Sequence, residues 1–265
     1  MAGSYAVSPG PEAIRTIAGR IHSIAAFLEQ EINKLGYRQM NAQYFDTLRF
    51  ALPDNVSAQQ VRTVALSKEV NLRYFKNGDV GMSIDETTDL AAVNVLLSIF
   101  GIAAGKDYTK AADIPESCTI AEAFRRQSAY LTHEVFNKYH TETEMMRYIK
   151  RLDRKDISLA HSMISLGSCT MKLNAAAEML PLSRPEFMGM HPLVPEDQAE
   201  GYRELIHNLS EELKVITGFA GVSLQPNSGA AGEYAGLRVI RAYQESIGQG
   251  HRNKVLIPAS APGTN

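Results

Sequence analysis

The chain has 265 residues, with 27 basic and 29 acidic side chains and a formal net charge of −2. A composition of 45% hydrophobic and 21% charged residues is that of an ordinary globular protein with one large domain or two smaller ones. The near balance of charge excludes a strongly basic nucleic-acid binder, and no apolar run reaches the roughly 20 residues of a membrane span.

The N-terminal region predicts a long helix followed by a strand. Apolar residues recur at three- and four-residue steps from Ile14 to Leu28, with Pro11 before them and Gly36 after them. Residues 44–52 are aromatic and β-prone and end at a Pro-Asp-Asn turn, which predicts a strand.

Three further local signals complete residues 1–105. Ser57 is a typical cap for a helix that ends near residue 66. Asn77-Gly78-Asp79 between two β-prone runs predicts a hairpin, and Asp89 or Thr88 predicts the start of a helix that reaches Gly101. We therefore expect residues 1–105 to form a small α/β domain of the α+β kind.

The composition of the chain changes after residue 105. Residues 106–156 are polar and charged and predict a linker with an exposed helix. Helices are expected at 202–217 and from the Pro-Asn-Ser-Gly sequence to Ser246, with short strands at 222–225 and 254–260.

One loop has the composition of an anion-binding site. Small and hydroxyl residues between a strand-like run and an amphipathic helix allow backbone N–H groups to approach a phosphate at the positive end of the helix. An ordinary strand-to-helix turn is an equally good reading of the same residues. They are Asn227, Ser228, Gly229, Ala230 and Gly232.

A second candidate is the small polar loop at 167–174. Ser168, Cys169 and Thr170 followed by Lys172 have side chains that bind carboxylates or phosphates, and the thiol or amine is in principle nucleophilic. A capped loop with a solvated lysine is the more economical interpretation.

Metal, disulfide and secretory signals are weak. Cys118 and Cys169 show no Cys-x-x-Cys pairing, and His133 and His140 lack the spacing of a zinc motif. The N-terminus has no signal-peptide pattern, so we expect a bacterial cytoplasmic protein, or a mitochondrial matrix protein if the source is eukaryotic.

Longer strings carry a specific resemblance. SLAHSMISLGSCTMKLNAAAEMLP, HPLVPEDQAEGYRELI and SLQPNSGAAGEYAGLRVIRAY together resemble the glycine decarboxylase, or P-protein, of the glycine cleavage system. The likeness extends upstream through NLRYF and SIDETTD and downstream through LIPASAPGTN, and so covers nearly all of the chain.

The resemblance implies a fold and an activity. The family has the aspartate-aminotransferase-like architecture, fold type I, and uses pyridoxal 5′-phosphate to decarboxylate glycine and pass the aminomethyl group to the lipoyl arm of the H-protein. It is built from two homologous halves, in a homodimer or a two-half assembly. Residues 1–105 would close the first half, and residues 157–265 would begin the large cofactor domain of the second, with the linker between them.

The resemblance also implies roles for individual residues. Asn227, Ser228, Gly229, Ala230 and Thr264 fall on cofactor-binding positions, and Ser168, Cys169 and Thr170 on positions that line the substrate entrance. The Schiff-base lysine of the family would lie beyond Asn265, so no catalytic residue is assigned here and Lys172 is not that lysine. Pro262 stands where the family has a histidine that stacks on the pyridine ring.

The resulting expectation is a glycine dehydrogenase (decarboxylating), an oxidoreductase, of which this chain is a portion that is inactive alone. The alternative is a non-catalytic module that docks on a full-length P-protein.

Overall fold

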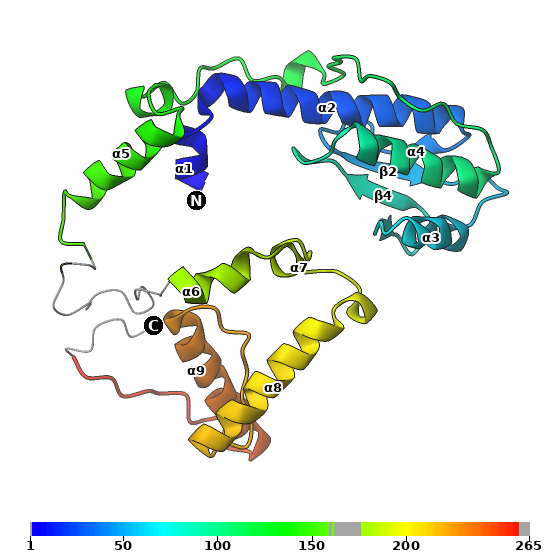
Figure 1. Cartoon of the computed structure of the whole chain (residues 1–265). Coiled ribbons are helices and arrows are strands. Elements are labelled where there is room, and N and C mark those ends of the chain that lie inside the picture. Colours follow the sequence, from blue (N-terminus) through cyan, green and yellow to red (C-terminus); the bar gives the residue numbers. More distant parts are fainter. Residues whose placement is uncertain (1, 159–160, 162–175, 260–265) are drawn as a thin grey trace. The chain divides into compact units, whose positions relative to one another are not determined.

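A computed structural model of the chain describes residues 2–158, 161 and 176–259. The chain divides into two compact units, residues 1–153 and residues 154–265. Figure 1 shows the helices and strands of both units.

The first unit begins with a short helix and a long one. Helix α1 spans Ala2–Val7 and helix α2 spans Gly10–Lys34, with a proline in its first turn. The predicted long helix is confirmed. Its buried residues between His22 and Ile32 form the face that packs on the rest of the unit.

A four-stranded antiparallel sheet lies at the centre of this unit. Its strands are β1 (Arg38–Gln39), β2 (Thr47–Ala51), β3 (Arg73–Tyr74) and β4 (Val80–Ser83), in the order β1-β2-β4-β3. The strand predicted at 44–52 and the hairpin between β3 and β4 are confirmed. Gly78 lies in the hairpin turn with φ of +92°, a conformation that glycine adopts without steric cost.

Two capped helices complete the core. In α3 (Ala58–Ser67) the Ser57 and Gln60 side chains form a reciprocal capping box, and in α4 (Leu90–Ala104) the Asp89 carboxylate accepts the N–H of Ala92 at 2.8 Å. Helix α4 contacts both α2 and α3, as Figure 1 shows. The first unit is therefore a mixed α/β structure around one apolar core, whose largest fully buried members are Phe50, Phe100, Ile24, Leu28, Ile32, Leu48, Leu97 and Ile99.

Residues 106–141, here called the strap, return along the first unit and are hydrogen-bonded to it. The strap contains two short 3-10 helices, Glu122–Phe124 and Glu134–Asn137, and is followed by the exposed helix α5 (Glu142–Asp153). Its hydrogen bonds join Asn94 with Ala111, Ser23 with Ser117, His22 with Thr119, Pro11 with Tyr130 and Ser8 with His140.

Two of these attachment points are tightly defined. The buried His22 ring places Nδ1 2.8 Å from the Phe45 carbonyl, so Nδ1 donates and Nε2 accepts the Thr119 N–H at 3.0 Å. At the other end of the strap, Gly10 has a φ of +73°, and a Cβ there would lie 2.8 Å from the backbone oxygen of Phe136. Glycine meets both conditions without strain.

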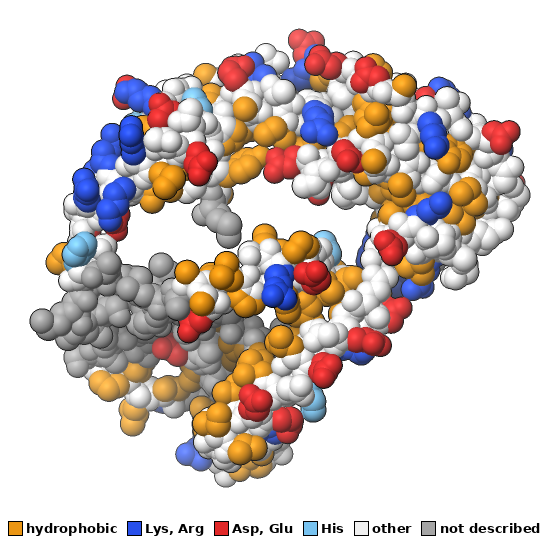
Figure 2. All heavy atoms as spheres, viewed as in Figure 1, with side chains coloured by type: hydrophobic (Ala, Val, Ile, Leu, Met, Phe, Trp, Pro, Cys, Tyr) orange, Lys and Arg blue, Asp and Glu red, His pale blue; other side chains and the backbone are white. Residues whose placement is uncertain are grey.

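The second unit contains helices without a buried core. They are α6 (Ala176–Met179), α7 (Pro185–Met188), α8 (Glu200–Thr217) and α9 (Gly229–Ser246), with 3-10 turns at Leu180–Ser183 and Glu196–Gln198. None of its described residues is buried. Figure 2 shows hydrophobic side chains gathered on its visible surface.

The helix predicted at 202–217 is confirmed by α8, and the helix predicted to end at Ser246 is confirmed by α9. The two short strands predicted at 222–225 and 254–260 are not observed among the described residues. Residues 222–225 and 254–259 have no strand partner within the described part of the second unit. A strand is stable only when its N–H and C=O groups are paired with a neighbour, so these runs stay irregular here.

Asp79 provides a testable link between pH and stability. Its carboxylate accepts hydrogen bonds from Asn77 Nδ2 at 2.9 Å and from Arg49 Nε at 2.7 Å, and these bonds lower its pKa despite its burial. A carboxyl group whose pKa is lowered by folding stabilises the protein above its unfolded pKa, about 3.9, and loses that contribution as pH falls further.

We therefore expect Asp79→Asn to lower the urea midpoint at pH 7, and the gap from the unaltered chain to shrink as pH falls below about 4. Circular dichroism at a series of pH values measures both midpoints. Asp54→Asn, at an exposed turn, is the matched control. A gap that is constant from pH 7 to pH 3 would contradict this expectation.

Candidate phosphate-binding site

The predicted anion loop lies at the start of α9. Ser228 is the cap residue, with an extended backbone at φ −156° and ψ 165°. Its Oγ accepts the N–H of Ala231 at 3.1 Å, and its carbonyl accepts the N–H of Gly232 at 3.0 Å. The local sequence folds this way because a serine hydroxyl satisfies a helix donor that has no partner in the preceding turn.

Two backbone donors remain open at this end of the helix. The N–H groups of Gly229 and Ala230 have no acceptor among the described residues. Donors in the first turn of a helix point out along its axis, where the aligned peptide dipoles add a partial positive charge. These groups therefore form an arrangement that favours a phosphate or carboxylate.

The surroundings are compatible with an anion. The first turn of α9 holds no acidic residue, and a Cβ on Gly232 would meet nothing within 4 Å. Asn227 and Ser228 are exposed, so the Asn227 amide and the Ser228 hydroxyl are accessible beside the two N–H groups. The four positions that the sequence places on one phosphate loop lie together in space.

The other predicted site residues are outside the described residues. They are Ser168, Cys169, Thr170 and Thr264, together with Lys172 and Pro262. The structure therefore relates none of them to Ser228. Within residues 2–158, 161 and 176–259, no group of three His, Cys, Asp or Glu side chains is placed to hold a metal ion, and no helix has the length and apolarity of a membrane span.

Sequence reasoning overlooked two tyrosine hydrogen bonds in the first unit, one of them partly buried and the other buried. The Tyr44 hydroxyl donates to the Glu29 carboxylate, and burial together with this bond raises the pKa of Tyr44 to about 12. Burial alone raises the pKa of Tyr37 to about 12, where the hydroxyl donates to the Phe100 carbonyl at 2.9 Å. Both groups join elements of the core. No local sequence signal marks them, because their partners are distant in the chain.

Comparison with known proteins agrees with the resemblance seen in the sequence. Residues 1–100 match the family "Glycine cleavage system P-protein". Over all 265 residues the chain is 80% identical to the glycine dehydrogenase (decarboxylating) of Bacteroides thetaiotaomicron. The chain is homologous to part of glycine dehydrogenase (decarboxylating). It is also 82% identical to the corresponding protein of Bacteroides fragilis and 51% identical, over 268 aligned positions, to that of Vibrio parahaemolyticus.

The predicted relationship to the P-protein is therefore confirmed. This chain spans 28% of the length of these glycine dehydrogenases, and each alignment covers the whole of it. The start of α9 lies outside residues 1–100, which match the family, but inside the alignments with the individual glycine dehydrogenases, which cover all 265 residues of this chain.

Proposed function

We propose that this chain supplies the cofactor-phosphate site of a P-protein in which pyridoxal 5′-phosphate supports glycine decarboxylation. The observation that carries the proposal is the capped start of α9, where Gly229 and Ala230 present unpaired N–H groups beside the Ser228 hydroxyl. The proposal is supported because this helix start lies at the same residues that the family resemblance assigns to the loop that binds the cofactor phosphate. The 80% identity to a glycine dehydrogenase adds to that support.

The residues of the site would act by binding and orienting. The N–H groups of Gly229 and Ala230 donate to phosphate oxygens, while Ser228 Oγ accepts from Ala231 and has its own proton free to donate. The Asn227 amide adds a donor at the edge. When bound, the cofactor supplies the electron sink for loss of carbon dioxide, and the chain fixes its position.

The wider proposal follows the family. We infer a fold type I cofactor domain from residue 157 onward, aminomethyl transfer to the lipoyl group of an H-protein, assembly as a homodimer or two halves, and a bacterial cytoplasmic setting. No residue of this chain is proposed for covalent attachment of the cofactor.

A second candidate function is a non-catalytic module that docks on a full-length P-protein. The observation that favours it is the exposure of apolar side chains on α8, including Leu205, Ile206 and Leu209. Mixing the chain with an intact P-protein and measuring a complex by analytical ultracentrifugation separates the two candidates. The first candidate, the cofactor-phosphate site, requires in addition that the chain binds a phosphorylated pyridoxal compound without any partner protein.

Binding of pyridoxamine 5′-phosphate is the direct test, because this amine forms no Schiff base with surface lysines. Equilibrium dialysis should show binding that pyridoxamine, which lacks the phosphate, does not share. Ser228→Ala should weaken binding about tenfold, since it removes a cap and a phosphate donor together. Ser210→Ala in α8, where Oγ bonds the Ile206 carbonyl, is the matched control.

Two results bear on the proposal. Equal binding of the phosphorylated and unphosphorylated amines would contradict the site. We also expect no glycine-dependent carbon dioxide release from this chain alone, and its detection would overturn the assignment of no catalytic residue.

A further inference from the structure

One buried histidine joins α2 to the strap. His22 is 1% exposed, and its Nδ1 lies 2.8 Å from the carbonyl oxygen of Phe45, in the loop before β2. On the strap side, its Nε2 lies 3.0 Å from the backbone nitrogen of Thr119 and 3.0 Å from Oγ1 of the same residue. The imidazole therefore bridges the loop and the strap.

The two backbone partners fix the protonation state of this ring. A carbonyl oxygen only accepts and a backbone N–H only donates, so Nδ1 carries a proton and Nε2 carries none. A second proton, on Nε2, would point at the Thr119 N–H, which is itself a donor. Thr119 Oγ1 could accept that proton, but the Thr119 N–H would then lose its acceptor. The attachment is complete only while His22 is neutral.

The charged groups of α2 and of the loop give a second proton on His22 little support. Tyr44 lies with its ring centroid 5.7 Å from that of His22 and donates to the Glu29 carboxylate, and burial and this bond raise the pKa of Tyr44 to about 12. The Asp46 carboxylate accepts the Thr47 hydroxyl at 2.9 Å. Both carboxylates are therefore bonded to hydroxyl groups. The positions one turn from His22 on α2 are uncharged, namely Ala18, Gly19, Ala25 and Ala26.

The strap places a positive charge beside Thr119. Arg125 donates to the carbonyls of the two residues that flank Thr119, through Nε at 2.9 Å to the residue after it and through Nη2 at 3.4 Å to the residue before it. Glu116 and Glu122, the strap carboxylates closest in sequence, are both exposed. A positive charge on His22 would therefore meet a guanidinium group on the segment that covers it.

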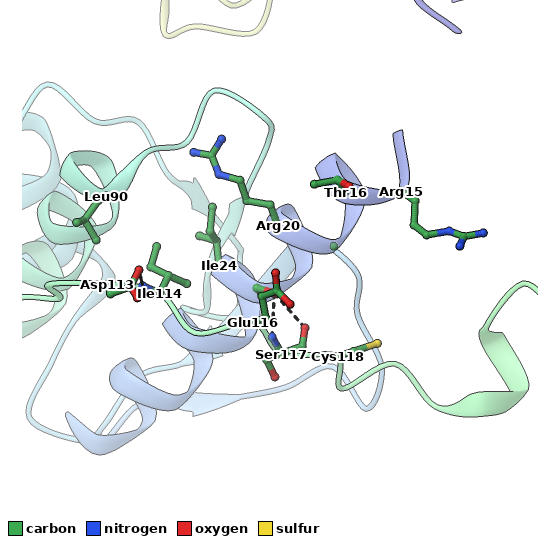
Figure 3. A pocket seen from close by; sticks show the side chains of 12 residues that line it. Arg15, Thr16, Arg20, Ile24, Leu90, Asp113, Ile114, Glu116, Ser117 and Cys118 are labelled. Carbon is green, nitrogen blue, oxygen red and sulfur yellow. Dashed lines mark hydrogen bonds between the residues drawn. The ribbon is translucent and has the colours of Figure 1, made fainter. Parts of the chain in front are cut away.

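A neighbouring attachment does not depend on a titrating group. Ser23 Oγ donates to the Ser117 carbonyl at 3.1 Å and accepts the Ser117 N–H at 3.0 Å, and Figure 3 draws these bonds as dashed lines. Ser117 and Cys118 line a groove of about 840 Å³ between α2 and the strap (Figure 3). Because Thr119 is the next residue along the strap, its displacement would widen this groove.

The far end of the strap is held by bonds that survive protonation. The Tyr130 hydroxyl donates to the Pro11 carbonyl at 2.7 Å. His140 Nδ1 lies 2.8 Å from the Ser8 carbonyl, which only accepts, so His140 is the donor there. A second proton on His140 adds to Nε2 and leaves this bond in place.

We propose that His22 makes the attachment of the strap pH-dependent, so that proton uptake by its ring releases the strap around Thr119 while Tyr130 and His140 still hold it. Histidine is the side chain that ordinarily changes its charge between pH 5 and 8. A buried imidazolium needs an acceptor for each N–H, and water supplies the second once the strap is displaced. Thr119 is itself exposed, so its displacement brings solvent to Nε2. Residues 227–230 take no part, and the inference stands apart from the proposed function.

Hydrogen exchange of the 265-residue chain tests this proposal. Protection of residues 115–124 should fall at least about tenfold between pH 7.5 and pH 5.0, after correction for the intrinsic pH dependence of amide exchange. Residues 96–100 in α4 and residues 128–132 of the strap should keep their protection, which separates local release from unfolding. Equal protection of residues 115–124 at the two pH values would overturn the proposal.

Two variants assign the effect to the ring. His22→Gln supplies an amide oxygen that accepts the Thr119 N–H at every pH, so protection of residues 115–124 should differ less than twofold between pH 7.5 and pH 5.0. Ser23→Ala, the matched control, removes the neighbouring attachment and keeps the imidazole, so the tenfold pH effect should remain. A tenfold fall in His22→Gln would overturn the proposal.

Nitrogen-15 spectra of the unaltered chain, labelled at histidine, give a test that needs no variant. At pH 7.5 the His22 ring should be neutral with its proton on Nδ1, and its titration midpoint should coincide with the loss of protection at residues 115–124. A proton on Nε2 at pH 7.5, or two separate midpoints, would overturn the proposal.

Discussion

Phe100→Ala is expected to lower the free energy of unfolding of the first unit by about 3–5 kcal/mol. Phe100 is fully buried on α4, with its ring centroid 4.9 Å from that of Tyr37 and 5.8 Å from that of Phe50. Truncation removes apolar contact with both rings and leaves a cavity, because α4 is held between α2 and α3 and cannot collapse into the space.

Urea denaturation followed by circular dichroism measures this loss. Phe124→Ala is the matched control, since Phe124 lies in the strap with 71% of its surface exposed and should change stability by less than about 0.5 kcal/mol. Equal effects of the two substitutions would contradict the assignment of the core to α4.

Limited trypsin digestion is expected to cut residues 176–259 at least about a hundredfold faster than residues 11–104. Cleavage requires a local opening of the backbone, and an opening that exposes no buried side chain costs little. Helices α8 and α9 have no buried residue, whereas α2 and α4 contribute half of the residues of the apolar core. Isolated helices of this length are marginal in water, which makes Arg203, Lys214, Arg238 and Arg241 accessible.

Mass spectrometry of the time course identifies the sites. The control is digestion of Phe100→Ala, which should speed cleavage at Arg20 and Lys34 and leave the rate within α8 and α9 unchanged. Early cleavage at Arg20 in the unaltered chain, before any cut in α8, would contradict the expectation.

Local signals predicted most of the first unit. A proline in the first turn of α2, the Asp89 cap of α4 and the glycine of the β3–β4 turn each act within a few residues. Such devices are visible in sequence because the groups that interact are close in the chain. The loop at residues 227–232 before α9 was predicted from the same kind of local signal, whereas the cap that Ser228 forms was not predicted.

Long-range pairings were not visible. The order β1-β2-β4-β3 and the attachment of the strap depend on partners far apart in the chain, such as His22 and Thr119. The strands expected at 222–225 and 254–260 are not formed among the described residues, for a related reason. Their composition predicts a strand, but a strand needs a neighbour, and none lies in the described part of the second unit.

The attachment of the strap sets an order of events in folding. The bonds from Ser117, Thr119, Tyr130 and His140 close loops of 94, 97, 119 and 132 residues. Closing such loops costs chain entropy, and the contacts that compensate for it exist only once α2 has a fixed surface. During synthesis, we therefore expect the core of residues 11–104 to form first, with one side of α2 still exposed to solvent. We expect the strap to cover that side in the last step of folding of the first unit.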